Sequence, residues 1–285
     1  MNHKNQLPLV SILLPIHNAE NTLSECIDSI LQQTYLNFEI IALDDGSTDR
    51  SVEVLNSYTD ERIKLYRCRH NYIRNLNRGL SLCNGKYIAR MDADDKMCNR
   101  RIEKQVEILE KYEQVDVCCS VMKSLGVKGE IKYGFNGILP NLKVLLLRGN
   151  FLSHPTMMFR KSLFLRGFRY KKDYIYAEDY KLWVDLALED IVFYNIPEAL
   201  IEYRTSTNQV SFVHNKQQTR TAWIIREELL EKLIRNSSQP LRCKLNKLYP
   251  SMLALNQEGL ISPKEFYDLF ANIFQRQAEK DYQQR

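Results

Sequence analysis

Three carboxylates lie within four residues at Asp92-Ala93-Asp94-Asp95, directly after an apolar segment at residues 87–91. Carboxylates this close repel one another unless a cation neutralises them, and hard oxygen ligands favour Mn²⁺ or Mg²⁺. The alternative is an acidic turn that caps the next helix, but such a turn needs one Asp rather than three. The spacing therefore predicts a divalent-cation site at this turn.

A second acidic turn, residues 44–49, follows the apolar segment 38–43 and reads DDGSTD. It is either a plain strand-to-helix turn, in which Ser47 or Thr48 with Asp49 caps a helix, or part of a ligand site. A carboxylate beyond those that the turn needs can accept the imide N–H of a uracil, so Asp45 is a candidate base reader.

Two further candidates lie in the second half of the chain. Glu178 and Asp179 begin a predicted helix, where an acidic pair usually only stabilises the helix N-terminus. The pair becomes a candidate catalytic base if the fold brings it opposite the cation site. His154, which Pro155 follows, fits either a structural turn residue or a ligand or acceptor contact.

The segments that must position these residues alternate between two patterns. Apolar runs predict strands at residues 9–16, 38–43, 63–67 and 86–91, and helical spacing predicts helices at 20–33, 51–58 and 76–82. This order is typical of a parallel sheet covered on both faces, with ligands beyond the carboxyl ends of its strands. We therefore expect the residues that follow the first, second and fourth strands to form one site for a nucleotide and a cation.

The rest of the chain predicts further elements and a boundary. We expect helices at 101–112, after Ala177, at 219–234 and at 264–274, strands at 115–121 and 154–160, and weak periodicity over 123–149. The predicted boundary near Ser211 to Gln217 gives a domain at 1–215. Residues 216–285 form a helical extension.

Composition and charge exclude several classes of protein. With 44% apolar residues, 10 Gly and 8 Pro in 285, the chain is neither disordered nor collagenous. Seven Cys without a C-x-x-C pair indicate a reduced, cytoplasmic compartment, and the first ten residues lack a signal-peptide pattern. Residues 1–215 carry 28 basic and 27 acidic side chains, and residues 216–285 carry 12 and 8. We expect no nucleic-acid partner, and a basic extension that either packs on the domain or contacts anionic lipid.

Several motifs in a fixed order carry a family resemblance over residues 8–212. They are PIHNAENTLSECIDSILQQT, FEIIALDDGSTD, GKYIARMDADD, NRRIEKQ, HPTMMFR, AEDYKLW and YRTSTNQVS. Their order resembles the family 2 inverting glycosyltransferases of bacterial polysaccharide and lipopolysaccharide synthesis. The resemblance implies an α/β fold of the GT-A type, with a mostly parallel central sheet flanked by helices and a C-terminal helical extension. It also implies that residues 1–215 are the catalytic domain, with a nucleotide-sugar half at about 8–122 and an acceptor half at about 123–215.

The resemblance also implies roles for individual residues. The end of the first strand, with Pro15, Ile16, Asn18 and Glu20, would lie along the uridine, and Asp45 would bond the uracil. In the Asp92-Ala93-Asp94 turn, Asp92 would face the ribose or the cation, and Asp94 would bind Mn²⁺ or Mg²⁺ that bridges the diphosphate. Asp179 would be the general base, with Glu178 and His154 on the acceptor side. Arg74 and Asn77 are assigned to the nucleotide from residues 71–79, a loop that is shorter than in similar sequences and lacks their first Gly.

These roles imply a metal-dependent enzyme that moves a hexose or N-acetylhexosamine from a UDP-sugar to a saccharide or lipid-linked saccharide. We expect it in the cytoplasm or at the cytoplasmic face of the inner membrane. A nucleotidyltransferase that makes sugar nucleotides is the enzymatic alternative, but it would need a Gly-rich basic loop after the first strand. A non-catalytic sugar-binding subunit is the other alternative, which loss of Asp94 or Asp179 would favour. Both residues are present.

Overall fold

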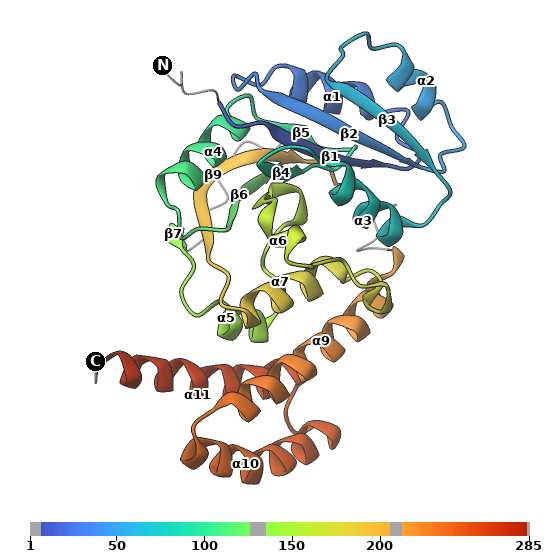
Figure 1. Ribbon diagram of the computed structural model, residues 1–285. Coiled ribbons are helices and arrows are strands. Elements are labelled where there is room, and N and C mark those ends of the chain that lie inside the picture. Colours follow the sequence, from blue (N-terminus) through green and yellow to red (C-terminus); the bar gives the residue numbers. More distant parts are fainter. Residues whose placement is uncertain (1–6, 126–134, 206–212, 284–285) are drawn as a thin grey trace.

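The computed structural model describes residues 7–125, 135–205 and 213–283 of the chain (Figure 1). The described residues form one sheet of nine strands, and β7 (Gly137–Ile138) pairs with β9 beside the main path. The main path runs in the order β3 (Ile63–Cys68), β2 (Phe38–Asp45), β1 (Val10–Ile16), β4 (Tyr87–Arg90), β8 (Met158–Arg160), β6 (Val117–Ser124), β9 (Phe193–Tyr203) and β5 (Lys96–Met97).

The first half of the sheet is the expected parallel arrangement. Strands β3, β2, β1 and β4 are parallel neighbours, and Ile16 at the end of β1 pairs with Asp44 near the end of β2. Alternate residues of β1 enter two different apolar cores, Leu13 on one face and Ile12 on the other. The helices between the strands cover these faces and are α1 (Leu23–Leu31), α2 (Ser51–Asn56), α3 (Tyr72–Leu82) and α4 (Arg101–Lys111).

The second half of the sheet is mixed. Strand β8 is antiparallel to both β4 and β6, whereas β6 and β9 are parallel. The strand expected over residues 154–160 is shorter than predicted, because His154–Thr156 forms a 3₁₀ turn and β8 begins at Met158. Two short helical segments follow it at Ser162–Leu165 and Lys172–Tyr174. The sheet is therefore mostly but not entirely parallel, with its polar loops gathered beyond β1, β2 and β4.

Helices α5 (Leu142–Arg148) and α7 (Glu178–Leu188) connect the sheet to the C-terminal helices. Helix α9 (Asn215–Asn236) packs on both of them and α11 (Pro263–Gln283) on α5, while α10 (Gln239–Gln257) contacts only the other two C-terminal helices among the stronger contacts (Figure 1). The predicted boundary lies partly outside the described residues, and α9 begins at Asn215. Among the described residues, no helix is both long and apolar enough to cross a membrane.

Candidate active site

The loop after β1 is held to the turn after β2. The side-chain oxygen of Asn18 accepts a hydrogen bond from the Thr48 amide at 2.9 Å, and the Glu20 amide donates to Asp49 at 2.9 Å. Asn18 adopts a left-handed backbone conformation with φ of 50°. Pro15 and Ile16 are buried at the end of β1. The structure therefore brings the first two predicted loops together at one edge of the sheet.

Asp45 is the buried carboxylate of this edge, with 1% of its surface exposed. Its Oδ1 atom accepts hydrogen bonds from the Asn71 amide at 2.7 Å and from the side-chain amide of Asn75. Its Oδ2 atom lies 3.0 Å from the Nδ1 atom of the exposed His70 but receives no hydrogen bond from the described residues. A buried acceptor without a donor is costly, so the oxygen that a uracil imide would use is still available for a ligand.

The two residues predicted from the altered loop do not contact Asp45. Asn77 uses both polar atoms of its amide on the backbone of Tyr170, at 2.8 and 3.0 Å, which gives it a structural role. Arg74 is exposed on α3, and its backbone amide donates to Asn71. Asn75, on the same helix, is the residue whose side chain contacts Asp45. It was not predicted, because only the tertiary contact with Asp45 distinguishes it from the other polar residues of α3.

The acidic loop after β4 gathers its carboxylates. Ligand oxygens of Asp92, Asp94 and Asp95 lie within 4.8 Å of one another. Burial, with the added charge of Asp92, raises the pKa of Asp94 to about 6 and that of Asp95 to about 8. The Asp95 Oδ2 atom is buried without a hydrogen-bond partner among the described residues. A cation would relieve both costs, so this donor set fits Mn²⁺ or Mg²⁺.

Two neighbours fix the backbone and one side chain of the acidic loop. The Ala93 carbonyl accepts a hydrogen bond from the hydroxyl of Thr22 at 3.1 Å, which joins the loop to the start of α1. The Arg204 amide donates to Asp95 at 2.9 Å, and its guanidinium donates to the Asp94 carbonyl at 2.9 Å. The loop is therefore held by elements from both halves of the sheet.

Arg90, at the end of β4, contacts the acidic loop and acts electrostatically on the acidic pair of α7. Its guanidinium is buried, forms an ion pair with Asp92 and donates to the Tyr72 hydroxyl at 2.8 Å. Burial would lower the pKa of Arg90, but the neighbouring Asp92 and Tyr72 raise it, so the side chain stays charged. Its positive charge also partly offsets the rise in the pKa of Asp94, Glu178 and Asp179 that burial causes. The acidic pair of α7 and the acidic loop are therefore both stabilised by the positive charge of Arg90.

Glu178 and Asp179 form the first turn of α7. The N-cap is Ala177, which makes no side-chain capping bond, so neither acidic residue is the cap itself. Asp179 accepts hydrogen bonds from the Tyr180 amide at 2.6 Å and from the Asn150 side chain at 3.2 Å. Burial and the charge of Asp179 raise the pKa of Glu178 to about 7, and burial also raises the pKa of Asp179. Carboxylates with raised pKa values in a shared cluster are typical of acid–base sites.

His154 lies in an aromatic cluster beneath this pair. Its Nε2 atom is 2.7 Å from the Tyr170 hydroxyl, and its ring meets Trp183 edge-on at 5.7 Å between centroids. Burial lowers the pKa of His154, so the imidazole is neutral. Among the described residues, His154 belongs to neither of the two clusters that could hold a metal ion. These contacts support the structural interpretation of His154 rather than a direct contact with the acceptor.

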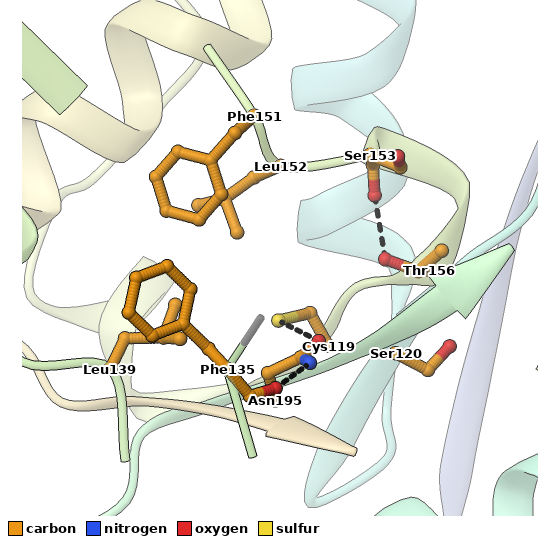
Figure 2. Close-up of a pocket in the computed structure, with 9 residues that line it drawn as sticks. All are labelled: Cys119, Ser120, Phe135, Leu139, Phe151, Leu152, Ser153, Thr156 and Asn195. Carbon is orange, nitrogen blue, oxygen red and sulfur yellow. Dashed lines mark hydrogen bonds between the residues drawn. The ribbon is translucent and has the colours of Figure 1, made fainter. Parts of the chain in front are cut away.

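A small apolar cavity lies beyond this cluster, between β6, β9 and the segment that leads to His154. Its volume is about 30 Å³, which suits one water molecule or one methyl-sized group rather than a sugar nucleotide. Figure 2 shows Phe135, Phe151 and Leu152 pointing into it. The full lining is Cys119, Ser120, Phe135, Leu139, Phe151, Leu152, Ser153, Thr156 and Asn195.

Comparison with known proteins gives consistent matches. The model of the family described as "Glycosyl transferase family 2" matches residues 11–168. An uncharacterized glycosyltransferase of Haemophilus influenzae is 40% identical over 236 residues, which cover 78% of this chain and 73% of that protein. The UDP-Glc:alpha-D-GlcNAc-diphosphoundecaprenol beta-1,3-glucosyltransferase WfgD of Escherichia coli is 29% identical, over 71% of this chain and 79% of its own length.

Among solved structures, residues 1–349 of TarS from S. aureus in complex with UDP-GlcNAc are similar in fold. The TM-score is 0.64 at 18% sequence identity, with 80% of this chain and 67% of that chain covered.

Proposed function

The chain belongs to glycosyl transferase family 2, and on that premise we propose that it transfers a hexose or N-acetylhexosamine from a UDP-sugar to a saccharide or lipid-linked saccharide. Its fold is the GT-A fold expected from the resemblance. Family membership also decides between the two enzymatic alternatives, glycosyltransferase and nucleotidyltransferase. The proposal extends to surface polysaccharide synthesis because WfgD, by its name, adds glucose to a diphosphoundecaprenol-linked sugar.

The observation that carries the proposal is that one buried guanidinium, that of Arg90, acts on two sets of carboxylates. It forms an ion pair with Asp92 of the Asp92, Asp94 and Asp95 cluster, and its charge favours the ionised forms of Glu178 and Asp179. A transferase needs a group that stabilises the charge of the departing diphosphate and a base near the attacking hydroxyl. The two sets of carboxylates supply candidates for both tasks on one side of the sheet.

Asp94 and Asp92 would hold the divalent ion, as the resemblance implies. Such an ion, when bound, stabilises the negative charge that develops on the leaving diphosphate. The residues of the chain supply the remaining functions. Asp45 would accept the uracil imide N–H at its unpartnered Oδ2 atom, beside the buried end of β1. Asn18 and Glu20 act through the loop that they brace.

Asp179 would take the proton from the acceptor hydroxyl. Its raised pKa favours proton uptake, and the Asn150 side chain orients one of its oxygens. A single base without a nucleophilic carboxylate on the opposite face of the sugar gives one displacement, which inverts the anomeric centre. An α-linked donor would therefore give a β-linked product.

Hydrolysis of a panel of UDP-sugars by the full chain with Mn²⁺ tests the proposal. Mass analysis of the products formed on a GlcNAc-terminated lipid or oligosaccharide then identifies the sugar added. We expect one donor to be consumed much faster than the others and to extend the acceptor by one sugar. Absence of turnover with every UDP-sugar, in a folded preparation that binds no UDP, would contradict the UDP-sugar assignment.

A further inference from the structure

A second group of metal-type ligands lies at the end of β2, apart from the acidic loop. His17 follows β1, Asp45 ends β2 and His70 lies between β3 and α3. One ligand atom from each residue lies within 4.8 Å of the other two. The His70 Nδ1 atom is 3.0 Å from Asp45 Oδ2, and the two imidazole rings are 4.6 Å apart between centroids.

Asp45 gives an independent indication that this cluster takes a ligand. Its side chain is 2% exposed, and within the described part of the chain its Oδ2 atom receives no hydrogen bond, although His70 Nδ1 lies 3.0 Å away. Both imidazoles are exposed, so an ion from solvent can reach them without opening the core. Burial of a carboxylate oxygen without a hydrogen bond costs free energy, and a cation bound between this oxygen and the two accessible imidazoles would offset that cost.

The backbone around the cluster is built to bring His70 close. Gly46 has φ of 73°, and a Cβ atom there would lie 2.9 Å from the His70 amide nitrogen. Only glycine therefore allows this approach without displacing the loop. The Nδ1–H groups of His17 and His70 donate to the same Asp45 carbonyl oxygen, at 2.9 and 3.2 Å, which leaves the Nε2 atom of each ring as the metal-binding nitrogen. The Nε2 atom of His17 lies 3.3 Å from the Asn18 side-chain amide, a contact that the ion would replace.

We propose that His17, Asp45 and His70 bind a transition-metal ion of the Zn²⁺ class. Two imidazole nitrogens and one carboxylate oxygen are a common protein ligand set for zinc, with solvent at the remaining position. The acidic loop offers only oxygen ligands and so favours Mn²⁺ or Mg²⁺ instead. The chain thus carries two cation sites of different ligand chemistry at one edge of the sheet.

The ion would exclude the nucleobase, because both need the same oxygen of Asp45. This exclusion rests on the proposed function, in which Asp45 Oδ2 accepts the uracil imide N–H. Zinc at this position would therefore compete with the donor for its base, and not for its diphosphate.

Calorimetric titration of Zn²⁺ into the metal-free full chain tests the binding. Cys243 is an exposed thiol, so the titrations use a Cys243→Ser background. We expect one site that His17→Gln and His70→Gln each weaken about tenfold or more. His214→Gln is the matched control, since it removes an imidazole that stacks on Tyr176 away from the cluster. Unchanged Zn²⁺ affinity in folded His17→Gln and His70→Gln variants would overturn the proposal.

Uridine, which has no phosphate to chelate the metal, tests the exclusion. We expect saturating uridine to weaken Zn²⁺ binding in the background protein, and we expect the ion to weaken uridine binding equally. If uridine binds and leaves Zn²⁺ affinity unchanged, the exclusion is wrong. If uridine does not bind while Zn²⁺ does, the metal site stands and the UDP-sugar assignment fails.

Discussion

Arg90 is the residue through which the two acidic groups of the site influence each other. A buried guanidinium that is paired with Asp92 is stable only while carboxylates surround it, and removing one partner leaves an uncompensated charge. Its position two residues before Asp92 places it on the same strand end as the acidic loop. Arg90 therefore links the predicted cation site to the predicted base electrostatically: it forms an ion pair with Asp92, and its charge acts on Asp179.

Asp94→Asn should weaken the binding of UDP in the presence of Mn²⁺ and remove most of its metal dependence. The substitution replaces a charged oxygen ligand, so we expect a loss of about 10- to 100-fold or more. Calorimetry with UDP, with and without Mn²⁺, measures both effects. Asp190→Asn is the control, because Asp190 is exposed, lies outside the site and has a left-handed backbone that Asn tolerates. Wild-type affinity and metal dependence in Asp94→Asn would exclude Asp94 as a ligand.

Asp179→Asn should retain UDP affinity and lose transfer. Proton transfer by a positioned base contributes about 10²- to 10⁴-fold, so turnover should fall by at least that factor. If Asp179 only stabilises the start of α7, the change should cost about 1 kcal/mol of stability while transfer survives. UDP affinity, melting temperature and turnover measured on one preparation separate these outcomes. Asp185→Asn, on the same helix, removes an ion pair with Lys181 and should lower stability without abolishing transfer.

The pH dependence of turnover should follow the coupled Glu178 and Asp179 pair. A base works only when deprotonated, and burial and the charge of Asp179 raise the pKa of Glu178 to about 7. The pair therefore takes up its first proton as the pH drops through about 7, and activity should fall over this range. Glu178→Gln removes the group of the pair that titrates near pH 7, so the acid limb of the pH–rate profile should move to lower pH, where Asp179 alone takes up a proton. A limb that stays in place or moves to higher pH would show that the pair does not control turnover.

Among individual residues, the sequence predicts the acidic side chains of the site better than the side chains that contact and position them. Asp45, Asp92, Asp94 and Asp179 follow strands or begin a helix, and these positions are readable from apolar runs and turn residues. Asn75 and Arg90 are not readable in this way, because each lies inside a regular element and becomes part of the site only through a tertiary contact with Asp45 or Asp92.

Helix α3 positions the altered loop because Gly79 lets it lie directly on β1 and β2. A Cβ atom at Gly79 would collide with the side-chain ends of Leu13 and Leu43. We expect Gly79→Ala to destabilise the protein by about 1–3 kcal/mol through overpacking. The higher helix propensity of alanine should offset up to about 1 kcal/mol of this loss. Thermal unfolding measures the change. Ser81→Ala, an exposed position on the same helix, should leave the melting temperature near the wild-type value, and equal effects of both substitutions would contradict this account.

Elements with a regular pattern were predicted, and those with an interrupted pattern were not. Strand β9 carries Pro197 and Glu198, where its pairing with β6 shifts register, so neither alternation nor a continuous apolar run marks it. Helix α10 contains Pro250 and fully buries only Leu245, so it lacks the apolar stripe that predicts a helix. Helix α5 is a short apolar run, and run length alone does not separate such a helix from a strand.

The whole molecule joins a sheet with its polar loops at one edge to a helical extension that packs on α5 and α7. Ile225, Leu229 and Leu230 of α9 are buried in this interface, and Arg226 lies 4.0 Å from the ring centre of Tyr267 on α11. The packing alternative for the extension therefore accounts for most of the apolar side chains of α9. Helix α9 also reaches the site, because Gln218 donates to the Tyr176 carbonyl at 2.9 Å, close to the predicted base.

Two apolar side chains of α9 stay exposed after the helix packs on the domain. Trp223 is 44% and Ile224 46% exposed, and the exposed Arg220 and Lys216 lie about one and two turns before them. Exposed aromatic and aliphatic side chains beside basic ones are typical of a helix that rests on anionic lipid. We expect the full chain to float with anionic vesicles, less so at high salt, and the double variant Trp223→Ser, Ile224→Ser to float less. Leu260→Ser, at a position 68% exposed between α10 and α11, is the matched control and should float like the wild type. Equal flotation of the wild type and the double variant would leave α9 without a role at the membrane.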